Sequence, residues 1–152
     1  MSDSITRPIP ESYWVLPGRF LAGEYPGNSD PQKAQLRLQS FLALGFTHFF
    51  DLTEPGEHGL EPYAPLLEAL APKSQPAPEG SPHCAHLRFQ LVDFRVPARR
   101  QMKAVLDAID QALAGGGKIY LHCFGGIGRT GTVVGWYLVR HGLTGPQAAT
   151  RL

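Results

Sequence analysis

The segment 118–141 constrains this chain more than any other part of the sequence, because three distinct patterns follow one another in it. Residues 119–121 form a short run of aliphatic and aromatic side chains, which favours a buried strand. A glycine-dense loop comes next, and the nearly all-apolar residues 130–141 then predict a helix. Gly142 stands where a glycine suits the position just past a helix C-terminus. The predicted order is therefore a strand, a tight loop and a helix.

The loop has the composition of an anion-binding site. Between Cys123 and Arg129 it contains Gly125, Gly126 and Gly128. Glycines let successive backbone N–H groups turn inward, and the N-terminus of the following helix adds about half a positive charge. A thiol placed there is expected to ionise easily, because the thiolate is the anion that such a loop favours. Arg129 offers a planar fork for two oxygens of a tetrahedral oxyanion, so the loop predicts a phosphoryl-transfer site.

The string His122-Cys123-x5-Arg129-Thr130 resembles the motif of the cysteine-dependent protein phosphatases, the protein tyrosine and dual-specificity superfamily. The continuation Gly-Gly-x-Gly-Arg-Thr-Gly is similar to the small dual-specificity and kinase-associated phosphatase branch. Cys-x5-Arg alone matches often by chance, but here the flanking strand and helix agree with it. The alternative is a buried cysteine in a glycine-rich turn.

The resemblance implies a role for each residue of the motif. Cys123 is the expected nucleophile, which forms a cysteinyl-phosphate, and Arg129 is expected to hold the phosphate with the backbone N–H groups of the loop. Thr130 is expected to hydrogen-bond the sulfur, and His122 to orient the loop and favour ionisation of the thiol. No metal or cofactor is expected, because the loop and the arginine supply the positive field. The expected substrate-binding residues are Phe124, Gly125, Gly126, Ile127, Gly128 and Arg129.

A phosphate ester also needs an acid that protonates its leaving oxygen. Asp93 lies 30 residues before Cys123 at the end of a predicted strand, and Asp93-x3-Pro97 resembles the general-acid loop of the family. Asp93 is therefore the expected general acid and base. The alternative is a strand-end aspartate that forms a turn or caps the helix predicted over 98–114.

The rest of the sequence predicts an α/β fold: a central parallel or mixed β-sheet flanked by helices on both faces, with the phosphate-binding loop between a strand and a helix. Residues 1–12 are expected to be a flexible arm, and 13–152 a single phosphatase domain that looks truncated at its C-terminus beside the family. Asp51, Thr53 and Glu54 lie at or just beyond the C-terminal end of a buried strand, and they either support the site or form caps and turns. The expected strands are 13–18, 20–23, 47–52 and 84–92, and the expected helices are 31–44, 61–70, 98–114 and one opened by a capping box of Thr144 and Gln147. The apolar side of the first helix is expected to carry Leu36, Phe41, Leu42 and Leu44, and helical spacing predicts one buried stripe on the third: Met102, Val105, Leu106, Ile109 and Leu113. The proline-rich residues 71–82 are expected to form an exposed loop.

Composition sets limits on the partners. The net charge of +1 gives no general attraction to nucleic acid or membranes, so neither is expected as a partner. The two cysteines form no disulfide framework, and the sequence shows no signal segment or 18-residue apolar run, which favours a cytoplasmic setting. Cys84 is expected to be a small buried side chain; the alternative is a disulfide partner that protects Cys123 from overoxidation.

The substrate is the least determined property. Residues 124–128 contain no lysine, whereas family members acting on phosphoinositides often carry basic residues there, which favours a singly phosphorylated side chain. We therefore expect a monomer that hydrolyses phosphotyrosine and phosphoserine or phosphothreonine in proteins or peptides. Two alternatives stay open: a phosphatase of a small molecule such as an inositol phosphate or nucleotide, and a phospho-binding module with little turnover. Arg95, Arg99 and Arg100 flank the acid and either attract a phosphorylated partner or solvate a helix start.

Overall fold

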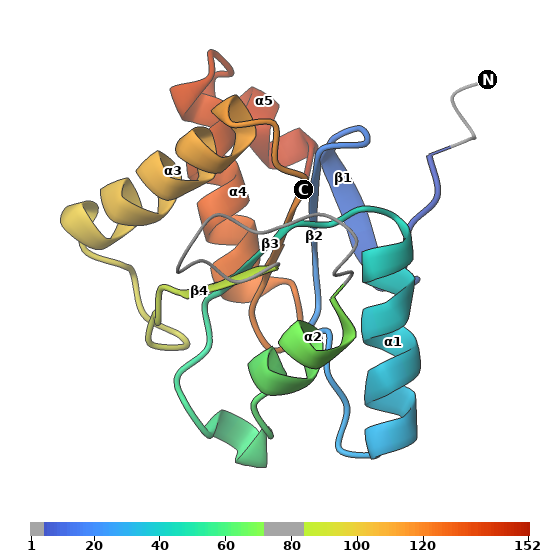
Figure 1. Cartoon of the computed structure of the whole chain (residues 1–152). Helices are drawn as coiled ribbons and strands as arrows, with labels where there is room; N and C mark the ends of the chain where they lie inside the picture. The colour runs from blue at the N-terminus through green and yellow to red at the C-terminus, as the bar shows by residue number, and fades with distance from the viewer. Residues whose placement is uncertain (1–4, 72–83) are drawn as a thin grey trace.

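A five-stranded mixed sheet forms the centre of the computed structural model, which describes residues 5–71 and 84–152 (Figure 1). The strand order is β1-β2-β5-β3-β4; β1 and β2 pair antiparallel, and the other three pairings are parallel. The mixed α/β sheet predicted from the sequence is therefore confirmed. The strands are β1 (Ser12–Leu16), β2 (Phe20–Gly23), β3 (His48–Asp51), β4 (Ala85–Arg88) and β5 (Ile119–His122).

Helices cover both faces of this sheet, as expected (Figure 1). The apolar side chains of α3, α4 and α5 pack with Phe20, Phe50 and Leu121 on one face, and those of α1 and α2 pack with Leu21 and Phe49 on the other. Successive strand residues point to opposite faces, so each strand contributes to both cores. The helices are α1 (Pro31–Ala43), α2 (Ala64–Leu70), α3 (Arg99–Ala114), α4 (Gly128–Arg140) and α5 (Gly145–Thr150), with a short 3₁₀ turn, η2, at Glu57–Gly59.

Local sequence signals explain where several helices begin. Asp30 caps α1 by accepting a hydrogen bond from the backbone N–H of Gln32, and Thr144 and Gln147 form the predicted capping box of α5. The buried stripe of α3 is also the predicted one: Met102, Val105, Leu106, Ile109 and Leu113.

The predicted buried side of α1 is partly wrong. Leu36 was assigned to it, but that side chain is 65% exposed. The buried positions are Ala34, Leu38 and Phe41, whose spacings of four and three residues place them on one side of the helix. Leu36 lies two residues from Leu38, which turns it to the opposite side.

Parts of the predicted N-terminal arm pack against the domain. Ile9 is buried in the same core as α1 and α2, and Ser12 already begins β1. Arg7 donates hydrogen bonds to the backbone oxygens of Pro10 and Ser12. Residues 1–4 and most of the loop predicted for 71–82 lie outside the described residues, and the domain boundaries stay a prediction. No helix in the described part of the chain is long and apolar enough to cross a membrane.

Candidate active site

The predicted phosphate-binding loop lies at the carboxyl ends of three parallel strands. It follows β5, which runs between β2 and β3, and open α/β sheets bind ligands at this edge. Both neighbours fix the loop through the backbone: Tyr25 N–H donates to Phe124 O at 3.0 Å, and Leu52 N–H donates to His122 O at 2.9 Å. The loop then enters α4, which begins at Gly128 and so places Arg129 in its first turn.

Gly126 must be a glycine. Its φ is +76°, and a Cβ on it would lie 2.4 Å from the backbone carbon of Gly23 in β2. This tight turn directs the Gly126 N–H toward Cys123 Sγ, with the nitrogen 3.3 Å from the sulfur. Cys123 itself is buried. One N–H of the predicted anion nest thus points at the sulfur, where an N–H donor stabilises a thiolate.

Arg129 connects the start of α4 with the two segments that follow β3 and β4. Its guanidinium donates end-on to Glu57, with Nη1–Oε1 at 2.8 Å and Nη2–Oε2 at 2.6 Å. Nη1 also donates to the backbone oxygens of Leu52 and Leu91, which follow β3 and β4. The hydrogen bonds from Arg129 are the main reason that the pKa of Glu57 lies below its usual value. Sequence reasoning missed Glu57, since nothing in its local sequence connects it with an arginine 72 residues later.

The other edge of the guanidinium has no hydrogen-bond partner among the described residues. Arg129 Nε is buried without a hydrogen bond among the described residues, and so is Thr130 Oγ1. Unpaired buried polar atoms are costly in folded proteins and indicate a ligand site. The free Nε–H edge is the one that can hold two oxygens of a phosphate, while Glu57 fixes the end-on pair. The predicted hydrogen bond from Thr130 to the sulfur is not made in this structure.

Asp93 reaches the same edge of Arg129. One of its carboxylate oxygens lies 3.6 Å from Arg129 Nε, and the same oxygen accepts the N–H of Phe94 in a turn. The structure thus brings Asp93 to the predicted phosphate position, although β4 ends five residues earlier, at Arg88, and not at 92 as predicted. Asp93 does not cap α3. The N-cap residue is Ala98, whose backbone N–H donates to Gln101 Oε1.

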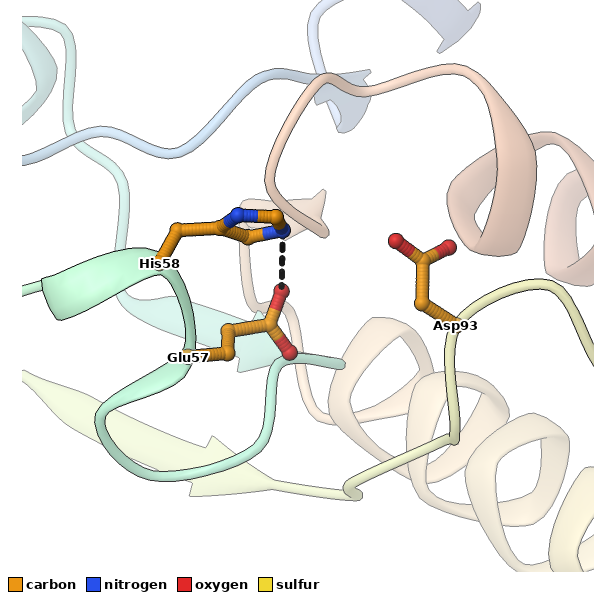
Figure 2. A group of neighbouring side chains, drawn as sticks. All are labelled: Glu57, His58 and Asp93. Carbon is orange, nitrogen blue, oxygen red and sulfur yellow. Dashed lines mark ion pairs between the residues drawn. The ribbon is translucent and has the colours of Figure 1, made fainter.

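Glu57, His58 and Asp93 form a group that resembles a metal site. Figure 2 shows Glu57 and His58 on one loop facing Asp93 on another, with one possible ligand atom from each residue within 4.8 Å of the others. Both Glu57 oxygens already accept hydrogen bonds from Arg129, whose fixed positive charge disfavours a cation beside it. We therefore assign Glu57 to the arginine and not to a metal.

Behind the loop, His122 belongs to a buried polar network. Its Nε2 lies 2.6 Å from the Tyr63 hydroxyl, and its Nδ1 lies 3.2 Å from Cys123 O. Burial lowers the pKa of His122 to about 4, against the opposing charge of Asp51, so the ring is neutral near pH 7. Burial also raises the pKa of Tyr63 well above 10, so its hydroxyl keeps its proton. Tyr63 therefore donates to Nε2, and Nδ1–H donates to the carbonyl of Cys123.

Asp51 supports this network from β3. Burial alone would raise its pKa, but hydrogen bonds from His86 and Thr53 and the proximity of His122 hold that pKa well below its usual range. Asp51 Oδ2 lies 2.9 Å from His86 Nε2 and 3.5 Å from Arg88 Nη2. Asp51 Oδ1 also accepts the N–H of Thr53, which forms a local turn. Asp51 therefore combines the two roles considered for it, contact with the buried network and formation of a turn. Tyr63 and His86 were not singled out by sequence reasoning.

The two cysteines lie on opposite faces of the sheet. Cys84 packs in the core below α1 and α2, where its Sγ lies 3.7 Å from Phe46 O, whereas Cys123 belongs to the other core. Burial raises the pKa of Cys84 to about 12. Cys84 is therefore the small buried side chain that was expected, and a disulfide between the two would require the sheet to be crossed.

Most of the predicted site residues line one cleft of about 540 Å³. Cys123, Arg129 and Asp93 contribute its reactive groups, and the loop contributes Phe124, Gly125, Ile127 and Gly128. Gly126, Thr130 and His122 lie behind this surface. The cleft thus brings together a thiol, a guanidinium and a carboxyl group, which is the set of groups that phosphoryl transfer to a thiol requires.

A family model described as Tc-R-P, "Polymorphic toxin system, DSP-PTPase phosphatase", matches residues 51–143 of the chain. This range contains both Asp93 and the complete loop from Cys123 to Arg129.

Solved structures agree with this match at the level of the fold. Tk-PTP in its active form is 24% identical with a TM-score of 0.69, and the alignment covers 91% of this chain and 80% of that one. Kinase associated phosphatase is 15% identical (TM-score 0.68), with 85% of this chain and 70% of that one covered. TpbA of P. aeruginosa, solved with pTyr, is 15% identical (TM-score 0.64), with 95% and 72% covered.

Proposed function

Because the chain belongs to this family of DSP-PTPase phosphatases, we propose that it hydrolyses phosphotyrosine and phosphoserine or phosphothreonine esters of proteins through a cysteinyl-phosphate. One observation carries the proposal: the unpaired edge of Arg129 lies in the same cleft as Cys123 and within 3.6 Å of Asp93. A phosphate held on that edge has a nucleophile on one side and an acid within reach of its ester oxygen.

In the first step, the Cys123 thiolate attacks phosphorus in line with the leaving oxygen. The S–P bond forms while the P–O bond breaks, and Asp93 gives its proton to the leaving oxygen. In the second step, water attacks phosphorus and gives its proton to Asp93. The S–P bond breaks, its electron pair returns to sulfur, and inorganic phosphate leaves.

Charge on the three equatorial oxygens is held by the backbone N–H groups of residues 124–129 and by Arg129. Glu57 keeps the guanidinium in place through its two end-on hydrogen bonds, so the free edge is already oriented before substrate binds. His122 positions the loop through the Cys123 carbonyl and acts as a neutral hydrogen-bond donor. Thr130 is the group proposed to bond the sulfur as it leaves phosphorus.

Two properties of the site favour a substrate with a single phosphate. Residues 124–128 offer no side-chain cation to a second phosphate, and Arg129 is already committed to Glu57 on one edge. An inositol polyphosphate or a nucleotide polyphosphate would therefore leave part of its charge unpaired.

The test is hydrolysis of p-nitrophenyl phosphate, phosphopeptides, an inositol phosphate and a nucleotide by the wild type, in buffer with EDTA. Cys123→Ser is expected to abolish turnover, and Cys84→Ser is the matched control that leaves it intact. Turnover that survives in Cys123→Ser would overturn the thiol mechanism. A wild type that binds vanadate but hydrolyses nothing would be a binding module, and preference for the inositol phosphate or nucleotide would replace the protein substrate.

A further inference from the structure

The mouth of the cleft carries the most exposed large apolar side chains of the described residues. Phe94 is 98% exposed, Val96 91% and Ile127 81%, and all three line the same cleft as Cys123. Phe124, which is 45% exposed, lies beside them. Single exposed apolar residues are normal on a protein surface, but a contiguous group at the mouth of a binding cleft indicates contact with a partner. We call Phe94, Val96 and Ile127 the apolar rim.

The backbone of Phe94 points to the same conclusion. Its φ is +60°, a left-handed conformation that bulky side chains rarely adopt. Asp93 holds it in place by accepting the Phe94 N–H. An exposed ring makes no buried contact that would offset the strain of its backbone. Strained residues of this kind cluster at sites that bind ligands. The turn that carries the proposed acid thus also projects an aromatic ring over the cleft.

The rim has a definite place relative to the phosphate. Phe94 and Val96 extend from the loop of Asp93, and Ile127 extends from the loop of Cys123, so the rim borders the position of the leaving group. Arg95 stands between the two apolar residues of the acid loop, and its exposed side chain makes no ion pair with another described residue. The surface is therefore apolar with a positive charge, which suits a phosphorylated peptide segment that carries an apolar side chain.

We infer that the apolar rim binds a large apolar side chain next to the phosphorylated residue of a peptide substrate. The inference rests on the proposed protein phosphatase function and narrows its substrate class. We take the ligand of the rim to be a peptide, because the rim borders the position of the phosphate directly. The residues on either side of a phosphorylated residue would lie over these side chains. Burying one such side chain is expected to raise kcat/KM about tenfold.

The experiment uses two phosphotyrosine peptides that differ only in the residues on either side of the phosphotyrosine, leucine in one and serine in the other. For each enzyme, the ratio of the two kcat/KM values is measured, so any effect of a variant on the chemistry cancels. The wild-type ratio is expected to be about ten. Phe94→Asn removes the ring and introduces a residue that tolerates a positive φ. Val96→Thr replaces one methyl group with a hydroxyl and keeps the shape of the side chain. Each variant is expected to lower the ratio toward one.

Leu36→Ser on α1 is the control, because it also removes an exposed apolar side chain, yet Leu36 does not line the cleft. It is expected to keep the wild-type ratio. The proposed role of the rim would be overturned by a wild-type ratio near one. It would also be overturned if Leu36→Ser lowered the ratio of the two kcat/KM values as much as Phe94→Asn does. A third contrary result would be a wild-type dimer in sedimentation analysis that is absent in Phe94→Asn. The rim would then be a contact between two copies of the chain.

Binding separates this inference from the proposed function. Dissociation constants of both peptides are measured on Cys123→Ser, which needs no turnover. If the wild type hydrolyses neither peptide but Cys123→Ser binds the leucine peptide about tenfold more tightly, the catalytic proposal fails and the rim stands. If both peptides are hydrolysed and bind equally, the rim fails and the phosphatase stands.

Discussion

The two sides of the loop from Cys123 to Arg129 are held in opposite ways. Behind it, His122 and Asp51 are almost completely buried, and every polar atom of the pair has a neighbour that bonds it or lies close. In front of it, the Asp93 turn is largely exposed and reaches the site through one contact with Arg129 at 3.6 Å. Regions with few buried contacts open and move most easily, whereas buried networks are over-determined. The rear side is therefore expected to set stability, and the front side to set rate.

The largest effect is expected from Asp51→Ala in the rear network. It removes a buried charge and leaves His86 and Arg88 without their carboxylate partner, which costs about 3–5 kcal/mol in typical buried pairs. Urea unfolding followed by circular dichroism measures this loss. Asp107→Ala, which removes an exposed carboxylate bonded to Lys103 and Arg140, is the control and is expected to change stability little. Equal losses in the two variants would contradict the comparison.

On the front side, Asp93→Asn is expected to lower kcat by about 10²–10³-fold with an alkyl phosphate substrate, because it removes the proposed general acid. The thermal midpoint is expected to stay at the wild-type value, since Asp93 caps no helix and is one-third exposed. A pH–rate profile checks the role, because the fall of activity at high pH should disappear in the variant. A large loss of stability with unchanged kcat would reverse the assignment.

The rear side also predicts a pH dependence of stability. The pKa of His122 is about 4 in the folded protein and about 6.5 in the unfolded chain, so the unfolded state binds the proton first as the pH falls. The free energy of unfolding should therefore decrease between pH 6.5 and 4, by on the order of 3 kcal/mol from this group. His122→Gln should show a shallower decrease in urea titrations over this range. An unchanged slope would mean that His122 does not titrate as described.

Tyr63→Phe is expected to have a smaller effect on both properties. The change leaves His122 Nε2 buried without its donor, which costs about 1–2 kcal/mol, and it frees the ring to adopt the other tautomer. The loop is then held less well through Cys123 O, and kcat should fall by roughly tenfold or less. Unfolding and kcat with p-nitrophenyl phosphate are measured together. A stability loss with no change in kcat would make Tyr63 a purely structural residue.

Much of the site could be predicted from the order of residues alone. The strand, the glycines and the helix that frame Cys123 and Arg129 are contiguous, and their conformations follow from local preferences for glycine turns and buried strands. The stripe of α3 and the caps of α1 and α5 also depend only on neighbours along the chain. Leu36 was misplaced because a run of several leucines fits more than one helical side, and only packing selects the one that is buried.

The partners of these residues were decided by the tertiary structure. Glu57 lies 72 positions before Arg129 and Tyr63 lies 59 before His122, and no local pattern connects either pair. They meet because β3 runs parallel beside β5, so that the segments after both strands converge at one edge of the sheet. The sequence by itself thus determined which atoms can do the chemistry. The fold decided which edge of Arg129 is left for phosphate, because the paired edge depends on a carboxylate that arrives from another loop.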